Sequence, residues 1–350
     1  MKNLLLLLAA ALIAGCAATT PVRRVTPVVK PLRTADETTV EKRIAELRSL
    51  LEPLPVRGIL CYPRAVMGSD IPLDLVFNRV RKLGFNHLRL HISSEVEFDD
   101  GLRAFLEAAH GFGIPVELML SQRDFFVRER GNRLLRKIRS GTPGLVEAVH
   151  LAARFNASLP AEHRFAGITV VIEPQYLVIG SPNLPPDALF AWNEKTYGPG
   201  LDNDLIMRRT FDVLRQLPEA AGDLPVSVAI PDFLHEKALS GELTVGSIAD
   251  FCAIDGIRRV IVINSGNRPS QLLAGISNEL KEAPKGAKIV IAVPVAEHSS
   301  VGAGALRRRD WKDFVRSLGY LVRNAGCHPA FEGVVVGPLA YLQFILTEKD

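Results

Sequence analysis

Short apolar runs recur along the chain, and most of them are continuous stretches of β-branched and aliphatic residues. Continuous runs of this length are typical of parallel strands that are buried on both faces of a sheet. Several begin just after a turn signal that contains glycine or proline, which fixes where each strand starts. We therefore predict eight strands, near residues 57–62, 86–91, 115–120, 166–172, 225–230, 258–263, 287–293 and 332–336.

Segments with helical periodicity fill the gaps between these runs. They lie near residues 73–83, 101–111, 142–158, 203–217, 269–282 and 309–325. Alternating strands and helices favour a parallel sheet, and eight such units in about 290 residues favour a closed α/β barrel of the (β/α)8 or TIM type. A further helix is predicted at 36–52, where it would cover the bottom of the barrel. The fourth loop, from Pro174 to about Asn203, is the longest and is predicted to form a wall of a substrate site.

The N-terminus has the pattern of an export signal. Lys2 precedes an apolar stretch from Leu4 to Ile13, which is too short for an ordinary membrane-spanning helix. The end of that stretch, Ile13-Ala-Gly-Cys16, resembles the lipobox of bacterial lipoproteins. This resemblance implies cleavage before Cys16 and acylation of its thiol; the alternative is an ordinary secretory signal with a coincidental cysteine.

The pattern divides the chain into three parts. Residues 1–15 are the predicted signal peptide, residues 16–35 a flexible tether, and residues 36–350 a single barrel domain. The predicted location is the cell envelope, with the lipid of Cys16 in the membrane. Because Ala17 and not aspartate follows the cysteine, we expect the outer membrane, facing the periplasm, in a Gram-negative cell.

Amino-acid composition and net charge bear on which kind of protein this is. An apolar content of 47% allows a large core, and removing Lys2 with the signal lowers the formal net charge from +4 to +3. This weak basic balance argues against a dedicated nucleic-acid-binding protein. The triplet Arg307-Arg308-Arg309 is a possible local patch, although we interpret it as the solvated start of a helix.

Three cysteines remain after the lipid cysteine: Cys61, Cys252 and Cys327. Their spacing matches no zinc signature. At most one intramolecular disulfide is possible among them, and the sequence leaves the pairing open. We expect Cys61 to be a small buried core residue.

Polar and aromatic residues follow the ends of the predicted strands. In a TIM barrel the active site lies at the C-terminal ends of the strands, so we predict a polar ring above an apolar barrel. In chain order the ring comprises Tyr62, Arg64, Arg89, His91, Glu95, Gln122, Arg123, Asp124, Glu173, Gln175, Tyr176, Asp232, His235, Asn264, Ser265, Glu297, His298 and Tyr341.

Two members of this ring, Glu173 and Glu297, follow the fourth and seventh strands. Glycoside cleavage needs two carboxyl groups across one bond, one to donate a proton and one to attack the anomeric carbon or activate water. Strands four and seven lie on opposite sides of a barrel mouth. We predict Glu173 as the general acid/base and Glu297 as the nucleophile. In the alternative, these glutamates cap strands or form ion pairs with Arg89 or Arg64.

Three short motifs resemble the retaining barrel enzymes of glycoside hydrolase clan A, over roughly residues 55–345. Phe85-Asn-His-Leu-Arg-Leu90 is similar to the clan's second strand, Ile172-Glu-Pro174 to its acid/base motif, and Val295-Ala-Glu297 to its nucleophile position. The resemblance implies a retaining mechanism in which Arg89 supports the nucleophile. The run from Gly167 to Pro174 also resembles poorly characterised bacterial barrel proteins related to glycosidases.

The chain departs from the clan at two places. Ile172 stands where the clan has an asparagine that contacts the sugar, and no tryptophan closes the eighth strand. The chain has two tryptophans and 7% aromatic residues, which is modest for a sugar cleft. The candidates for stacking against a sugar are Tyr62, Phe125, Tyr176, Trp192, Tyr197 and Tyr341, and each is as well explained by packing.

Arg89 and His91 alternate with apolar residues and therefore point to the same side of their strand. If that side is the barrel interior, Arg89 is buried and needs a carboxylate partner. Glu297 and Glu173 are the first choices; the alternative is another acid of the barrel that pairs with Arg89 for stability alone.

Other chemistries have weaker signals. The chain has no Gly-x-Ser-x-Gly elbow, no glycine-rich phosphate loop, and no His-x-His or His-Glu-x-x-His motif, so we predict neither a metal nor a cofactor. Besides the two glutamates, we predict substrate binding by Arg89, His91, Tyr62, Arg64, Gln122, Tyr176, Asp232, Asn264, His298 and Tyr341.

These features predict a lipid-anchored envelope protein whose barrel cleaves a polysaccharide with retention. Its predicted partners are a polysaccharide or oligosaccharide, the membrane and an envelope protein complex, without nucleic acid. One alternative is a non-catalytic barrel that binds glycan or scaffolds an envelope complex; the departure at Ile172 motivates it. Another is an enzyme of different chemistry on the same barrel.

Overall fold

The computed structural model describes residues 35–62, 72–92, 98–121, 144–176, 178–180, 189–263, 276–297, 307–308 and 310–348. Several predictions fall on residues outside these ranges. They concern the signal peptide, Cys16, most of the tether, Arg64, Glu95, Gln122, Arg123, Asp124, Phe125, Asn264, Ser265 and His298.

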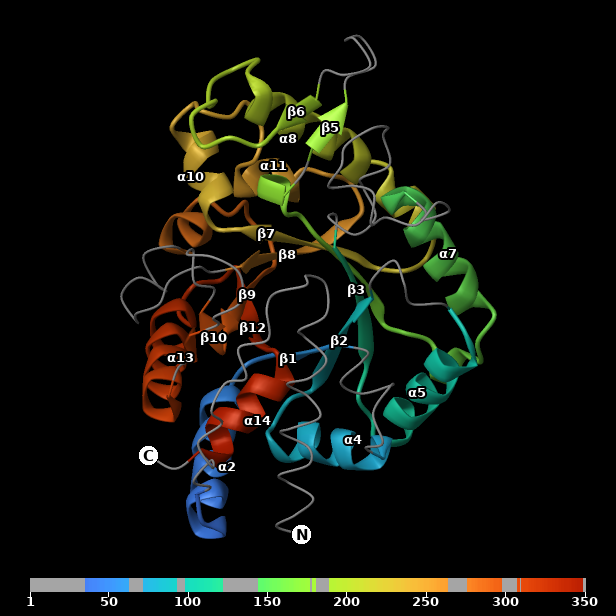
Figure 1. Ribbon diagram of the computed structural model, residues 1–350, viewed down its shortest axis with the longest axis vertical. Helices are drawn as coiled ribbons and strands as arrows, with labels where there is room; N and C mark the ends of the chain where they lie inside the picture. Colours follow the sequence, from blue (N-terminus) through green and yellow to red (C-terminus); the bar gives the residue numbers. More distant parts are fainter. Residues whose placement is uncertain are drawn as a thin grey trace, which may run out of the picture.

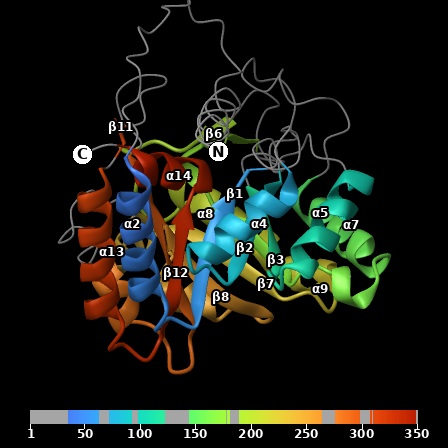
Figure 2. The same ribbon diagram turned by 90° about the horizontal axis from the view of Figure 1, so that it is seen from below.

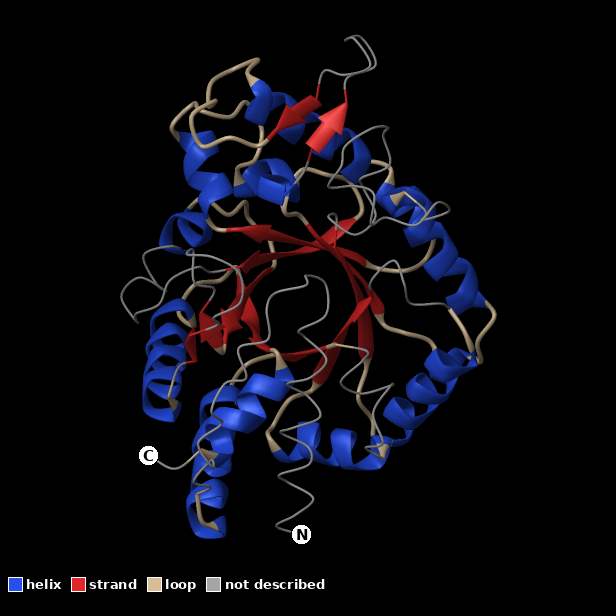
Figure 3. Cartoon of the chain, in the orientation of Figure 1, coloured by secondary structure: helices blue, strands red, loops and turns tan. Residues whose placement is uncertain are grey.

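Eight parallel strands close into one barrel, in the order β1-β12-β9-β8-β7-β4-β3-β2 (Figures 1 and 3). The predicted (β/α)8 barrel is therefore confirmed. Each observed strand overlaps a predicted run. The strands are β1 (Val56–Cys61), β2 (His87–Ile92), β3 (Val116–Ser121), β4 (Gly167–Val171), β7 (Val226–Pro231), β8 (Ile257–Ile263), β9 (Ile289–Pro294) and β12 (Phe331–Gly337).

Helices surround this barrel on its outside (Figure 2). Those that match predicted segments are α2 (Glu37–Leu51), α4 (Leu73–Lys82), α5 (Asp100–Gly111), α7 (Leu145–Ala157), α8 (Asp202–Leu214) and α13 (Trp311–Ala325). Residues 276–281 are also helical and fall within the segment predicted at 269–282. The sequence did not predict α9 (Leu217–Ala221), α10 (Phe233–Leu239), α11 (Ile248–Cys252), α14 (Leu339–Thr347) or the short 3-10 turn η2 (Ala161–His163).

Helix α2 lies in the outer ring beside α13 and α14 and does not cover the bottom of the barrel (Figures 1 and 2). The side chain of Asp36 accepts a hydrogen bond from the Thr39 backbone at 2.8 Å and so caps the start of the helix. Arg43 then donates to the backbone carbonyls of Ile345 and Leu346 at the end of α14, at 3.2 and 2.9 Å. These bonds hold α2 against the last helix and explain its position.

The apolar core has two parts. A large cluster fills the layer between the sheet and the helices, and a smaller one fills the middle of the barrel. Because successive side chains of a strand point to opposite faces, β1, β4, β7, β8, β9 and β12 supply residues to both parts, whereas the inner face of β2 is polar. The interior cluster comprises Val56, Val171, Ala229, Ile261, Val290 and Val335.

Two short hairpins extend the fold beyond the barrel strands. The long fourth loop contains the 3-10 turn η3 (Pro174–Tyr176), and β5 (Val178–Gly180) pairs antiparallel with β6 (Leu189–Ala191). After β9, β10 (Ala296–Glu297) pairs antiparallel with β11 (Arg307–Arg308). Arg307 and Arg308 therefore do not start a helix as predicted, because they pair with β10 as a strand, and Asp310 caps α13.

Within the described ranges, no helix combines the length and the apolar character needed to cross a membrane.

Candidate active site

Glu173 lies two residues beyond the end of β4, at the C-terminal mouth of the barrel. Val171 belongs to the cluster inside the barrel, so the alternation of the strand carries Glu173 to the same interior side. Ser121, the last residue of β3, stands opposite Val171 in the strand register. Its hydroxyl Oγ donates a hydrogen bond to Glu173 Oε2 at 2.6 Å.

Ser121 is a site residue that the sequence analysis missed. It is 4% exposed and belongs to the interior face of β3, together with Glu117 and Met119. The alternation within Glu117-Leu-Met-Leu-Ser121 was the available signal, because it places the serine on the same face as the buried acid.

Tyr62 and His91 lie together on the neighbouring side of the mouth. Their ring centroids are 5.3 Å apart and their planes are inclined by 57°. Tyr62 follows β1 directly, His91 is the penultimate residue of β2, and both are half-buried. The ends of four consecutive barrel strands, β1 to β4, thus bring together two predicted binding residues, a hydroxyl donor and the predicted acid/base.

Glu297 lies in β10, just after the seventh barrel strand, β9. The antiparallel pairing places it opposite Arg307 of β11, so a second strand fixes its backbone. This position is the one that the sequence assigns to the nucleophile. The approach of its carboxyl group to Glu173 stays a prediction.

Arg89 is 1% exposed and lies inside the barrel, and the structure describes Glu117 as a carboxylate partner. Its Nη2 forms an ion pair with Glu117 Oε2 at 2.9 Å, and its Nη1 donates to Thr169 Oγ1 at 2.6 Å. Glu117 stands opposite Arg89 in the register of β2 and β3. Another acid of the barrel therefore pairs with Arg89, as in the alternative, and the support of Glu297 by Arg89 stays a prediction.

This ion pair is part of a buried network in the barrel interior. Arg259 of β8 contacts Glu117 at 3.4 Å and is also bonded to Glu332 of β12. Burial alone would raise the pKa of Glu117, but the positive charges of Arg89 and Arg259 more than offset it and lower that pKa below its usual range. Glu117 therefore stays ionised and ties β2, β3 and β8 together beneath the site.

His87 lies beside the same network, with its Nε2 3.9 Å from Glu117 Oε1. Burial is the main cause that lowers the pKa of His87, and the neighbouring Arg89 and Arg259 lower it further, although Glu117 opposes them. The imidazole is consequently neutral near pH 7. It adds no charge to a cluster in which the two buried arginines already balance two glutamates.

Asp232 follows the fifth barrel strand, β7, as predicted, and its backbone N–H donates to the Ile263 carbonyl at 3.1 Å. It is 9% exposed and lies near a second buried acid, Glu279 of the helical segment 276–281. Burial, helped by the negative charges of Asp232 and Glu236, raises the pKa of Glu279 to about 8. The helical segment after β8 therefore contains a buried carboxyl group that keeps its proton at neutral pH.

His235 is a structural residue. It is fully buried, and its Nδ1 accepts a hydrogen bond from the Ile248 backbone at 3.1 Å, which joins α10 to the start of α11. Burial lowers the pKa of His235, so the ring is neutral. Among the described residues no group of three or more histidine, cysteine or acidic side chains is arranged to hold a metal ion.

Two positions near the predicted site belong to packing. Tyr341 was predicted at the mouth of the eighth strand, but β12 ends at Gly337 and Tyr341 lies in the first turn of α14, against the outer core. Ile172 is fully buried in that core, so the position that resembles the asparagine of clan A contributes no polar group to the site.

Two aromatic residues of the long fourth loop also pack against the outer core. The rings of Trp192 and Tyr197 lie 5.7 Å apart, edge to face, and both pack against the outer core. Lys237 of α10 lies over the Tyr197 ring at 4.3 Å. Gln175 is half-buried beside Glu173, and Tyr176 ends the turn η3.

The three cysteines of the domain are free thiols. Cys61 is buried in the outer core, as expected, and burial raises its pKa far above the usual range. Burial also raises the pKa of Cys252 to about 11, whereas Cys327 is exposed.

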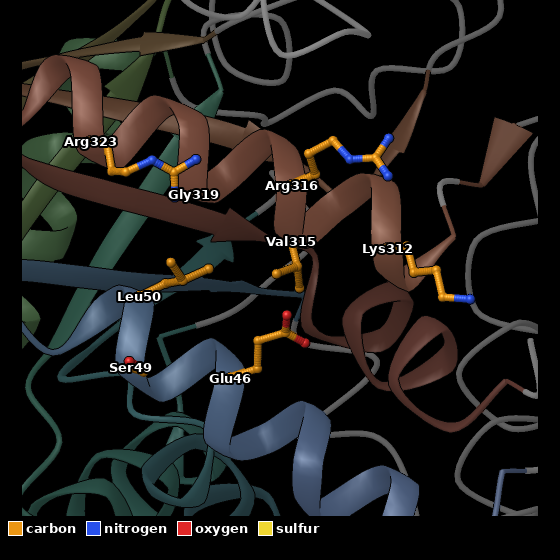
Figure 4. Close-up of a pocket in the computed structure, with 8 residues that line it drawn as sticks. All are labelled: Glu46, Ser49, Leu50, Lys312, Val315, Arg316, Gly319 and Arg323. Atoms are coloured by element: carbon orange, nitrogen blue, oxygen red, sulfur yellow. The ribbon is translucent and has the colours of Figure 1, made fainter.

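A groove of about 430 Å³ lies between α2 and α13, on the outer ring of helices (Figure 4). Leu50 and Val315 face each other across it, and Lys312 and Arg323 lie toward its two ends. None of the predicted site residues lines this groove. We therefore place the candidate site at the ends of the barrel strands, where the polar side chains converge.

No family model matches the chain, and no curated protein matches it in sequence.

Several solved structures are similar to the chain. One is xylanase 10B from Thermotoga maritima, with 13% identity, a TM-score of 0.48, and coverage of 83% of this chain and 86% of the xylanase. Another is the glycoside hydrolase GH5_18 from Streptomyces cattleya in complex with GlcNAc, with 15% identity, a TM-score of 0.47, and coverage of 81% and 70%. A third is a GH18 chitinase from Pseudoalteromonas aurantia, with 11% identity, a TM-score of 0.44, and coverage of 81% and 94%.

These neighbours are glycoside hydrolases, the class of protein that the sequence motifs resemble. At identities of 11–15% and TM-scores of 0.44–0.48 the similarity concerns the barrel, and the chemistry of this chain has to be argued from its own residues.

Proposed function

We propose that this protein is a retaining glycoside hydrolase that cleaves a polysaccharide at the mouth of its barrel. The observation that carries the proposal is the position of Glu173. Its carboxyl group lies at the interior end of the fourth strand, where the Ser121 hydroxyl holds it at 2.6 Å. Chemistry on this fold takes place at that end of the strands, where loops supply the binding groups.

The neighbours of Glu173 suit a sugar substrate. Tyr62 and His91 form a pair of flat rings at the ends of β1 and β2, on the same mouth of the barrel, and each ring also carries polar atoms that can bond hydroxyl groups. Aromatic faces pack against the apolar faces of sugar rings, and imidazole or phenol groups bind their hydroxyls. These four residues therefore combine the two kinds of contact that carbohydrate binding requires.

In the proposed mechanism, Glu297 attacks the anomeric carbon while Glu173 gives its proton to the departing glycosidic oxygen. The bond to that oxygen breaks and a covalent glycosyl ester forms on Glu297. Glu173, now ionised, takes a proton from water, which attacks the same carbon and releases Glu297. Two inversions give net retention, and this geometry needs a separation of roughly 5 Å between the two carboxyl groups.

The first experiment is a hydrolysis assay of the domain from residue 36 on a panel of bacterial polysaccharides. We expect the wild type to release reducing ends from at least one substrate, and Glu297→Ala and Glu173→Gln to reduce that rate at least about a hundredfold. Glu219→Gln, an exposed position in α9, is the matched control and should retain full activity. Equal rates for the wild type and Glu297→Ala on every substrate would contradict the proposal.

The second candidate function is a non-catalytic glycan-binding barrel, and one observation favours it. Ile172 is buried in the outer core at the position of an asparagine that contacts the sugar in the resembling enzymes. This candidate predicts binding of a polysaccharide with no hydrolysis, and binding that survives Glu173→Gln. Isothermal titration calorimetry on the same panel distinguishes the two functions.

We also propose that the protein is anchored in the cell envelope by a lipid on Cys16. The apolar stretch from Leu4 to Ile13 and the following Ala-Gly-Cys support this proposal. In cells expressing the full chain, Cys16→Ser should move the protein from the membrane fraction to the soluble fraction. The control Cys327→Ser changes an exposed thiol of the domain and should stay with the membrane. A Cys16→Ser protein that remains in the membrane fraction would argue against the anchor.

A further inference from the structure

We propose that Ser121 is a positioning residue for Glu173, one that fixes the plane of its carboxyl group. The inference rests on the proposed function. It concerns a residue that no sequence motif indicated, and it is carried by the 2.6 Å hydrogen bond from Ser121 Oγ to Glu173 Oε2.

The first step of the argument is the rigidity of the donor. Ser121 ends β3, is 4% exposed, and stands in register with Val171 of β4. Both strands are paired on both sides within the closed barrel, so the hydroxyl is attached to a part of the molecule that cannot shift freely. A donor fixed in this way holds its acceptor in one orientation.

The second step is the support beneath the pair. Thr169 lies on the same face of β4 as Glu173, and its Oγ1 accepts a hydrogen bond from Arg89 and contacts Glu117 Oε2 at 3.2 Å. The ion pair of Arg89 with Glu117 joins β2 to β3 below the mouth. The spacing of β3 and β4, and with it the distance from Ser121 to Glu173, is therefore set by buried polar contacts.

The third step is the chemistry. The hydrogen bond from Ser121 stops the carboxyl group of Glu173 from rotating, so that its proton is delivered in one direction. Loss of the hydroxyl should therefore impair proton transfer more than substrate binding.

The test uses the variants Ser121→Ala, which removes the donor, and Ser121→Thr, which keeps a hydroxyl. For Ser121→Ala we expect kcat to fall about tenfold with KM nearly unchanged. A hydrogen bond to a carboxyl group contributes a free energy that corresponds to about a tenfold change in rate. Ser121→Thr should restore most of kcat.

The matched control is Ser227→Ala. Ser227 is buried on β7 and stands in register with Thr169, one layer below the mouth. The Ser227→Ala variant loses the same hydroxyl volume from the barrel wall without altering the contact of Ser121 with Glu173, so its kcat should match that of the wild type. Circular dichroism melts of all variants identify any that fail to fold, and Ser121→Thr then carries the comparison.

The outcomes separate this inference from the proposed function. An active wild type with unchanged kcat in Ser121→Ala, or an equal loss of kcat in Ser121→Thr, would overturn the positioning role alone. A wild type that hydrolyses no substrate of the panel would overturn the proposed function, and the positioning role would fall with it. A lower kcat at nearly constant KM in Ser121→Ala, with rescue by Ser121→Thr, would support both.

Discussion

Glu279→Gln should make the protein more stable at neutral pH, because Glu279 is a buried acid placed among other acids. It is 1% exposed, its Oε1 lacks a hydrogen-bond partner, and Asp232 and Glu236 act on it with negative charge. Burial, and to a smaller extent these charges, raises its pKa from 4.5 to about 8. Glutamine keeps the shape of the protonated acid and has no proton to lose.

The sign of the effect follows from proton linkage. Between pH 4.5 and pH 8 the folded protein keeps a proton on Glu279 that the unfolded chain has released. The wild type therefore has its full free energy of unfolding below the pKa of Glu279 in the unfolded chain. It loses part of that free energy as the pH rises through the pKa of Glu279 in the folded protein. One pKa unit corresponds to about 1.4 kcal/mol, so Glu279 should lower the free energy of unfolding of the wild type by roughly 2–3 kcal/mol between pH 5 and pH 7.

Urea denaturation followed by circular dichroism at pH 5, 6, 7 and 8 measures this difference. The two proteins should have nearly the same free energy of unfolding at pH 5, and Glu279→Gln should be the more stable by about 2–3 kcal/mol at pH 7. Glu219→Gln, at an exposed site, is the control and should run parallel to the wild type. Parallel curves for Glu279→Gln and the wild type over the whole range would refute the reasoning.

Two further substitutions test the barrel beneath the site. Glu117→Gln removes the carboxylate that neutralises the buried Arg89, and urea denaturation should show a loss of about 3–5 kcal/mol; a loss below 1 kcal/mol would contradict the network. Gly333→Ala would place a Cβ 1.9 Å from the Val56 carbonyl at a φ of +151°, so soluble yield and circular dichroism should show failure of β12 to close on β1. Gly286→Ala has a φ of +86° and open space around its Cβ, so it should fold with only a small loss, and a folded Gly333→Ala would contradict the clash.

Most of the barrel could be predicted because its strands are buried on both faces. A run such as Ile289–Pro294 is apolar throughout, which is typical of a strand buried on both faces of a sheet. The helices that the sequence did not predict are either short or apolar on all sides. Helices α10 and α11 contain 7 and 5 residues, too few for two turns of periodicity, and α14 is apolar nearly all round, so it shows no amphipathic stripe.

Less of the site could be predicted, because contacts between its residues depend on how neighbouring strands are aligned with one another. The alternation of Arg89 with Leu88 and Leu90 placed Arg89 on one side of its strand, and the structure shows that this side is the barrel interior. Its partner, Glu117, is opposite it only because β2 and β3 pair with a particular offset, which neither strand reveals alone. The contact of Ser121 with Glu173 has the same origin in the offset of β3 and β4.

The measurement that tests the central claim most directly is covalent labelling of the nucleophile. The domain is incubated with a set of 2,4-dinitrophenyl 2-deoxy-2-fluoro-glycosides, which slow the second step of a retaining mechanism. It is then digested with trypsin, and the masses of the peptides are measured by mass spectrometry. The peptide Ile289–Arg307 contains Glu297 as its single acidic residue. The account predicts one fluorosugar on that peptide. A label on another peptide, or no label with any reagent, would contradict it.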